Sequence, residues 1–257
     1  MLTPPEIARS LLAAGESKAR LPLGKMLLLA ILAGAYIALA GVGATAAAVT
    51  LESGSLAKLL SACVFPAGLS MVILAGSELF TGNCLMVMAL LERRITPAQL
   101  LRNWLTVYLG NAVGGAAVAA LAVYSHTASL FGDGLARSMV SIAESKAALG
   151  FGDAFLRGVL CNFLVCLAVW MAAASKRAEG KVIALFFPIL LFVLCGYEHC
   201  IANLYYLPAG AFAAAEYGVE TTLTLAGCLE NLAAVTLGNL VGGAALGVGY
   251  RFAYLKE

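Results

Sequence analysis

The chain has 257 residues, of which 62% are hydrophobic and only 12% are charged, and its formal net charge is +2. A soluble domain is about 45–50% apolar and about 25% charged, so this composition excludes an ordinary soluble enzyme and predicts an integral membrane protein. The small charge, without a basic run containing aromatic residues, excludes a nucleic-acid-binding protein. The seven cysteines include no C-x-x-C pair, so no metal or cofactor site is predicted.

The first 24 residues are predicted to form a cytoplasmic amphipathic segment. Thr3-Pro4-Pro5-Glu6 resembles a capping box with proline at the first helical position. Ile7, Leu11 and Leu12 would then share one apolar face, and we expect this helix to lie on the inner membrane surface. Residues 25–257 are predicted to form the transmembrane domain.

Runs between charged residues predict six transmembrane helices, because a helix needs ~20 apolar residues to cross a bilayer. Four runs are uninterrupted: 26–51, 103–125, 158–175 and 231–250. The second run, 59–91, and the fifth, 182–215, are too long for one straight helix. Each contains a carboxylate near its middle, Glu78 and Glu198 respectively. We therefore expect spans two and five to be interrupted.

Lysine and arginine residues predict the orientation of the chain. They gather before the first span, between spans two and three, between spans four and five, and after span six, where Arg251 and Lys256 lie. Cytoplasmic loops carry such an excess of positive residues. Both termini are therefore predicted to be cytoplasmic in a multi-pass protein of the cytoplasmic membrane.

An internal duplication relates the two halves of the chain, about residues 26–125 and 154–254. Residues 107–117 read VYLGNAVGGAA, and residues 235–245 read VTLGNLVGGAA. Each half holds three spans, an odd number, so the second half must be inserted in the opposite direction. The predicted architecture is a pair of inverted three-helix repeats.

The interrupted segments also match each other. Both have the form G-x-E-x-x-x-x-N, from Gly76 to Asn83 and from Gly196 to Asn203, and a Phe-Pro pair precedes each. In transporters built from inverted repeats, paired broken helices mark the permeation site. The N-terminal ends of such half-helices favour an anion.

Three stretches resemble the signature sequences of the formate/nitrite transporter family. They are residues 76–83 (GSELFTGN), 161–168 (CNFLVCLA) and 196–203 (GYEHCIAN). The resemblance extends from about Lys18 to the end of span six. It implies an all-α, aquaporin-like fold, a homopentamer in the lipid bilayer with one pore per protomer, and no enzymatic activity. It also implies transport of a small monovalent anion such as formate, nitrite or hydrosulfide, either channel-like or coupled to protons.

An intramembrane enzyme is the alternative from another functional class. The sequence has no H-E-x-x-H pair, and Gly68-Leu69-Ser70-Met71 lacks the glycine that intramembrane serine proteases place after the nucleophile. The sequence also lacks the N-P-A pair of water channels. Both observations favour an anion transporter.

His199 and Thr81 are the candidate pore residues. His199 lies where the first half has Leu79, and ionisable groups at membrane depth are costly and usually functional. A neutral imidazole could donate a hydrogen bond to an anion and exchange a proton with it, or could be satisfied by loop carbonyls as a structural residue. The Thr81 hydroxyl could bond the anion or His199, or cap a helix. We expect an apolar ring of Leu79, Phe80 and Ile201 to disfavour a bare charge, so that a proton accompanies import.

Polar side chains near the breaks are expected to hold the loops. A carboxylate facing the pathway would repel an anion, so we assign loop-pinning roles to Glu78, Glu198, Asn83 and Asn203. Asn111, Asn162 and Asn239 could anchor the loops as well. Asn162 and Asn239 could instead lie on the anion pathway, and the sequence leaves both possibilities open.

Two lysines are candidates for attracting anions at the vestibules. Lys146 is predicted in the outer loop before span four, where the resemblance places a vestibule lysine, although it could simply pair with Glu144. Lys18 could act in the same way on the inner side, or could be an ordinary positive-inside residue. A cation at either mouth would raise the local concentration of anions.

Overall fold

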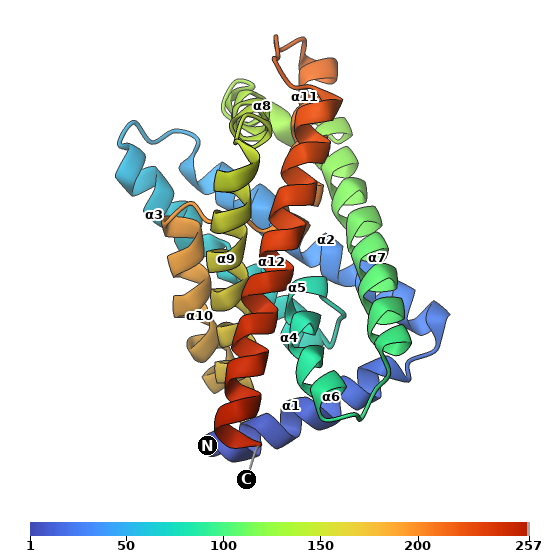
Figure 1. Cartoon of the computed structure of the whole chain (residues 1–257). Coiled ribbons are helices and arrows are strands. Elements are labelled where there is room, and N and C mark those ends of the chain that lie inside the picture. The colour runs from blue at the N-terminus through green and yellow to red at the C-terminus, as the bar shows by residue number, and fades with distance from the viewer. Residues whose placement is uncertain (256–257) are drawn as a thin grey trace.

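The computed structural model describes residues 1–255, so Lys256 and the end of the predicted transmembrane domain lie outside the described residues. The described part consists of helices joined by short connections (Figure 1). Among them are α2 (Leu23–Ala48), α3 (Gly54–Val64), α4 (Pro66–Ala75), α7 (Pro97–Tyr124), α9 (Phe151–Ala173), α10 (Ala178–Leu194), α11 (Cys200–Tyr217) and α12 (Leu225–Tyr254). The others are α1 (Pro4–Ala19), α5 (Phe80–Asn83), η1 (Cys84–Met86), α6 (Val87–Leu91), η2 (Thr127–Ser129) and α8 (Gly134–Ala147).

Within residues 1–255, five helical stretches are long and apolar enough to cross a membrane. They are Leu23–Ala48, Gly54–Ala75, Pro97–Tyr124, Phe151–Ala173 and Leu225–Tyr254. The second of these combines α3 and α4, which meet at Pro66. The prediction of an all-helical, multi-pass membrane protein is confirmed at this level.

Close helix packing joins α2 to α7 and α9 to α12. The approach is tightest at glycines. A Cβ atom added to Gly114 of α7 would overlap the Ile31 carbonyl oxygen of α2, and one added to Gly242 of α12 would overlap the Val159 carbonyl oxygen of α9. Small residues permit such backbone contact between membrane helices. The matched glycines of the sequence repeat therefore hold the two helix pairs together.

The variant Gly242→Ala is expected to lower the free energy of unfolding by about 1–3 kcal/mol, because α9 and α12 must separate to admit the methyl group. Gly249→Ala, on the same helix, is the matched control, since no atom lies within 4 Å of its added Cβ. Thermal unfolding of both purified variants in detergent measures the difference. Equal midpoints for the two variants would contradict the packing argument.

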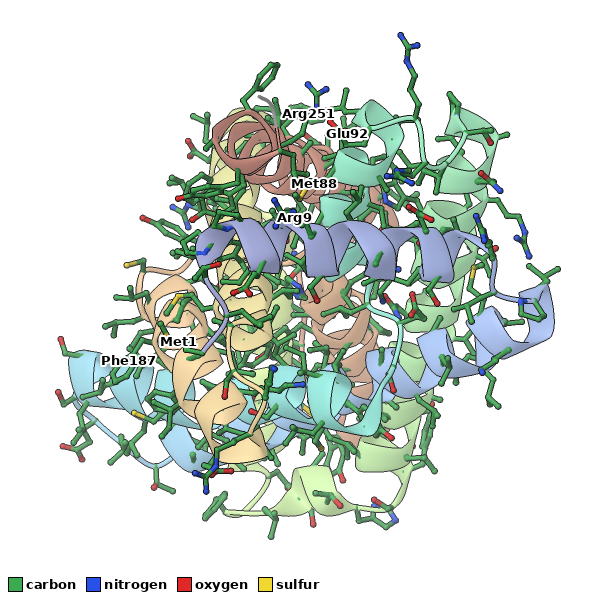
Figure 2. The ribbon with its side chains drawn as sticks, turned by 90° about the horizontal axis from the view of Figure 1, so that it is seen from below. Met1, Arg9, Met88, Glu92, Phe187 and Arg251 are labelled. Carbon is green, nitrogen blue, oxygen red and sulfur yellow. The ribbon has the colours of Figure 1, made fainter. Side chains whose placement is uncertain are left out.

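Helices α1 and α8 lie across opposite ends of the bundle (Figure 1). Helix α1 begins as predicted, with the Thr3 N–H donating to Glu6 Oε2 at 2.7 Å. Its apolar face packs on the protein, where Ile7 and Ala8 are buried, in addition to any contact with the membrane surface. Figure 2 shows α1 crossing the underside of the molecule beside Arg251 and Glu92, whose side chains form an ion pair of 2.7 Å.

The chain leaves helical geometry within both matched motifs. Helix α4 is followed by Gly76 at φ 78°, and α5 begins at Phe80. Helix α10 is followed two residues later by Gly196 at φ 69°, and α11 begins at Cys200. Glycine adopts this left-handed backbone without the steric cost that other residues carry. The loop backbone lacks helical hydrogen bonds at both breaks, so other groups must satisfy it.

Candidate functional site

Asn111 holds the first broken loop. Its Oδ1 accepts the Phe80 N–H at 3.0 Å, and its Nδ2 donates to the carbonyl oxygens of Glu78 at 2.9 Å and Ala30 at 2.7 Å. The side chain is fully buried. One amide therefore ties the loop to both α7 and α2.

Asn239 holds the second broken loop in the same way. Its Oδ1 accepts the Cys200 N–H at 2.9 Å, and its Nδ2 donates to the carbonyl oxygens of Glu198 at 2.9 Å and Gly158 at 2.8 Å. Asn162 Nδ2 donates to the carbonyl oxygens of Thr81 at 3.2 Å and Asn239 at 2.7 Å. Of the two possibilities open for Asn162 and Asn239, these contacts match the loop anchor.

Glu78 lies at the centre of a polar chain on the α1 side of the molecule. Its carboxylate accepts hydrogen bonds from Lys18 Nζ at 2.7 Å and from Asn83 Nδ2 at 2.8 Å. Asn83 Nδ2 also donates to Asn103 Oδ1 at 2.9 Å. Lys18 thus contacts a loop carboxylate instead of standing alone as a positive-inside residue.

Glu198 occupies the equivalent place on the α8 side. Both of its carboxylate oxygens accept hydrogen bonds from Lys146 Nζ at 3.0 Å, and Oε2 also accepts one from Asn203 Nδ2 at 2.7 Å. Asn203 Nδ2 also donates to Asn231 Oδ1 at 2.7 Å, and Asn231 Nδ2 donates to the Lys146 carbonyl oxygen at 2.8 Å. These hydrogen bonds form a closed ring, because Lys146 bonds Glu198 through its ammonium and Asn231 through its backbone carbonyl.

The prediction that Lys146 lies in a loop is wrong, and so is the alternative that it pairs with Glu144. The residue lies in the last turn of helix α8, not in a loop, and its partner is Glu198, not Glu144. Glu144 instead accepts hydrogen bonds from Thr221 and Thr222, and the Thr222 backbone N–H lowers the pKa of that carboxyl. Helix α8 was missed because its polar residues lack the long apolar run used to locate spans.

The sequence repeat contains a further signal for these polar chains. Lys18 and Lys146 are 128 residues apart, as are Asn103 and Asn231, and the same spacing relates residues 107–117 to 235–245. Extending the repeat alignment toward the N-terminus pairs Lys18 with Lys146 and identifies Asn103 and Asn231 as further members.

His199 and Thr81 bring the two broken loops together. His199 precedes α11, and its Nδ1 accepts the Ala202 N–H at 3.1 Å. A neutral ring that accepts at Nδ1 carries its proton on Nε2, which we assign from this hydrogen bond. Nε2 lies 3.0 Å from Thr81 Oγ1 and donates to it. The ring also stacks on Phe192, with centroids 5.8 Å apart.

Two cavities approach this pair from opposite sides. The Lys18 vestibule, of about 290 Å³, is lined by Lys18, Ser77, Glu78, Leu79 and other residues of α1 and α4. The Lys146 vestibule, of about 350 Å³, is lined by Lys58, Lys146, Arg157, Glu198 and His199 together with Phe65 and Phe192. Leu79 therefore borders one vestibule and His199 the other.

A narrow apolar constriction lies between the vestibules. Its cavity measures only about 10 Å³ and is lined by Phe65, Leu69, Leu79, Phe192, His199 and three other apolar residues. A space of this size holds at most one water molecule. His199 supplies the polar side chain in the lining of this constriction.

The expected apolar ring is only partly present at the constriction. Leu79 lines it, but Phe80 packs against Trp104 and Tyr108, with ring centroids 6.4 and 5.1 Å away. Ile201 is fully buried and lines none of the three cavities. Phe65, which precedes α4, Leu69 of α4 and Phe192 of α10 line the constriction instead.

Known proteins of one family match nearly the whole chain. The family model described as formate/nitrite transporter matches residues 5–253. A probable formate transporter of Methanothermobacter thermautotrophicus is 38% identical over 99% of this chain and 98% of its own. The formate channel FocA of Haemophilus influenzae is 39% identical over 86% of this chain and 84% of its own. A solved pentameric formate channel with formate bound superposes with a TM-score of 0.80 at 33% identity, covering 91% of this chain and 98% of that one.

Proposed function

The chain belongs to the formate/nitrite transporter family, and we propose that it transports small monovalent anions, formate first among them, across the cytoplasmic membrane. The observation that carries this proposal is the pair of vestibules, each with a lysine in its wall, which meet at an apolar constriction beside His199. Nitrite and hydrosulfide have the same charge and a similar size. The named relatives are channels and transporters, which disfavours the intramembrane enzyme considered above.

The topology that fits this function has six spans in two inverted repeats. Helices α3–α6 would form the second span and α10–α11 the fifth, each broken at its matched motif. Supporting this, Asn111 and Asn239 make equivalent contacts to the two loops. With both termini cytoplasmic, the Lys18 vestibule faces the cytoplasm and the Lys146 vestibule faces outward. The pentameric state of the solved relative supports a homopentamer.

The route of an anion follows from the charges along it. Lys18 and Lys146 lie at the mouths, where each is paired with a glutamate, Glu78 or Glu198, that offsets its attraction for anions. The constriction disfavours a bare charge, and the polar residue in its lining is His199, whose neutral Nε2–H is bonded to Thr81 Oγ1. An anion that takes this hydrogen bond displaces Thr81. His199 therefore acts as a neutral donor at the narrowest point.

Proton coupling is proposed to work without charging His199. A proton added at Nδ1 would face the Ala202 N–H and break that hydrogen bond. Loss of the Nε2 proton would leave an imidazolate, which is far more costly. An inside-negative potential opposes entry of a bare anion by ~2.3 kcal/mol per 100 mV. Import therefore uses a proton taken up by the anion in the vestibule water, while export can carry the anion alone.

Proteoliposomes that contain the purified protein test the proposed function. We expect them to take up labelled formate far faster than protein-free vesicles, and to exclude a large monocarboxylate such as gluconate because of the constriction. Native mass spectrometry of the same sample should give a pentamer. Formate uptake equal to that of protein-free vesicles would contradict the proposed transport, and a stable trimer or tetramer would contradict the proposed assembly.

A further inference from the structure

The Lys146 vestibule holds more positive charge than its carboxylate compensates. Lys58 of α3, Lys146 of α8 and Arg157 of α9 all line it, against the single carboxylate of Glu198. Lys146 is already paired with both oxygens of Glu198. Lys58 and Arg157 form no ion pair with a carboxylate of residues 1–255.

The two unpaired cations lie close to the paired lysine. Burial opposes the charge of the Lys58 ammonium most strongly, the charges of Lys146 and Arg157 also oppose it, and the Glu198 carboxylate favours it. Glu198 in turn is attracted by Lys146 and Arg157. A Cβ atom added to Gly196 would lie 3.9 Å from Lys58 Nζ. The Lys58 ammonium is therefore next to the second broken loop. The vestibule is left with two positive charges in excess.

The opposite vestibule has no such excess. Its charged lining consists of Lys18 and Glu78, which neutralise each other at 2.7 Å. This difference between the two cavities does not follow from the repeat, because Lys58 and Arg157 are additional to the matched Lys–Glu pairs.

We infer that the Lys146 vestibule binds a dianionic oxyanion between Lys58 and Arg157 and that this ligand blocks the pathway from that side. Two excess positive charges attract a dianion more strongly than a monovalent anion, and the planar guanidinium of arginine binds two oxygens of one ligand at once. The cost of moving an ion into an apolar medium rises with the square of its charge. A dianion therefore cannot follow formate through a constriction of about 10 Å³.

The inference rests on the proposed function only for its transport readout, and sulfate serves as the probe. Calorimetric titration of the purified protein with sodium sulfate, at constant ionic strength, should show one site per protomer. Lys58→Gln and Arg157→Gln should each weaken sulfate binding by about tenfold, as expected for the loss of one charge near a dianion. Arg137→Gln is the matched control, because Arg137 lines a different hollow and bonds the Gly132 carbonyl.

Sided vesicles test the block. Sulfate on the Lys146 side of right-side-out membrane vesicles should inhibit formate uptake competitively, and the same concentration on the Lys18 side of inside-out vesicles should not. The conservative variant Lys58→Arg should retain inhibition, which separates loss of charge from damage to the fold. Absence of sulfate binding, or equal inhibition in Lys58→Gln, Arg157→Gln and Arg137→Gln, would overturn the inference. Wild-type vesicles without formate flux would overturn the proposed function instead, while the calorimetry would still decide the sulfate site.

Discussion

Asn239→Leu is expected to abolish anion flux and to lower the free energy of unfolding by about 2–6 kcal/mol. Leucine has a similar volume but cannot accept the Cys200 N–H or donate to the Glu198 carbonyl. Both loop groups are buried, and each unpaired buried group costs about 1–3 kcal/mol. The Gly158 carbonyl loses an additional partner, although it belongs to helix α9 and retains its helical hydrogen bond.

The loss of flux has a separate cause from the loss of stability. Asn239 fixes the backbone on both sides of His199, so without it the loop that carries the ring loses its anchor beside the constriction. Thermal unfolding and formate flux of Asn239→Leu should both be measured against Leu237→Ala, a variant on the exposed face of the same helix. An Asn239→Leu protein that unfolds at the same temperature as the control and transports normally would show that the loop holds its shape without this amide.

The breaks and their polar residues could be predicted because each appears twice. Glu78 and Glu198 stand at the same place in the two G-x-E-x-x-x-x-N motifs, and an unpaired charge at membrane depth needs a nearby partner. Each carboxylate does accept a hydrogen bond from the asparagine five residues later. Carboxylates that recur at membrane depth in both halves of the chain therefore predict hydrogen bonds within each motif.

Contacts between distant helices could not be predicted in the same way. Phe65 and Phe192 meet edge to face at 5.7 Å beside His199, and their apolar side chains look the same in the sequence as those that face lipid. Which apolar residues form the constriction depends on how α4 and α10 pack, and hydropathy does not specify that packing. The sequence does not predict the Lys146–Glu198 pair, because α8 is polar and its residues predict a loop.

His199→Phe is expected to reduce formate flux by about 10- to 100-fold at every pH. The substitution removes the Nε2–H donor from the constriction, and a hydrogen bond to a charged group contributes about 1.5–3 kcal/mol. Phenylalanine also cannot accept the Ala202 N–H, so some of the loss reflects a weaker start to α11. His199→Asn separates the two effects, because asparagine is among the best residues at a helix N-cap.

The pH dependence of the asparagine variant distinguishes a neutral donor from a proton carrier. Because the Ala202 N–H opposes a proton at Nδ1, we expect His199→Asn to lower influx by the same factor at external pH 5.5 and 7.5, so that the ratio between the two is retained. The measurement is paired influx and efflux of labelled formate in vesicles at both pH values. If His199→Asn removes the stimulation of influx at low pH while efflux continues, the histidine itself carries the proton. The ring must then leave its hydrogen bond to Ala202 during each transport cycle.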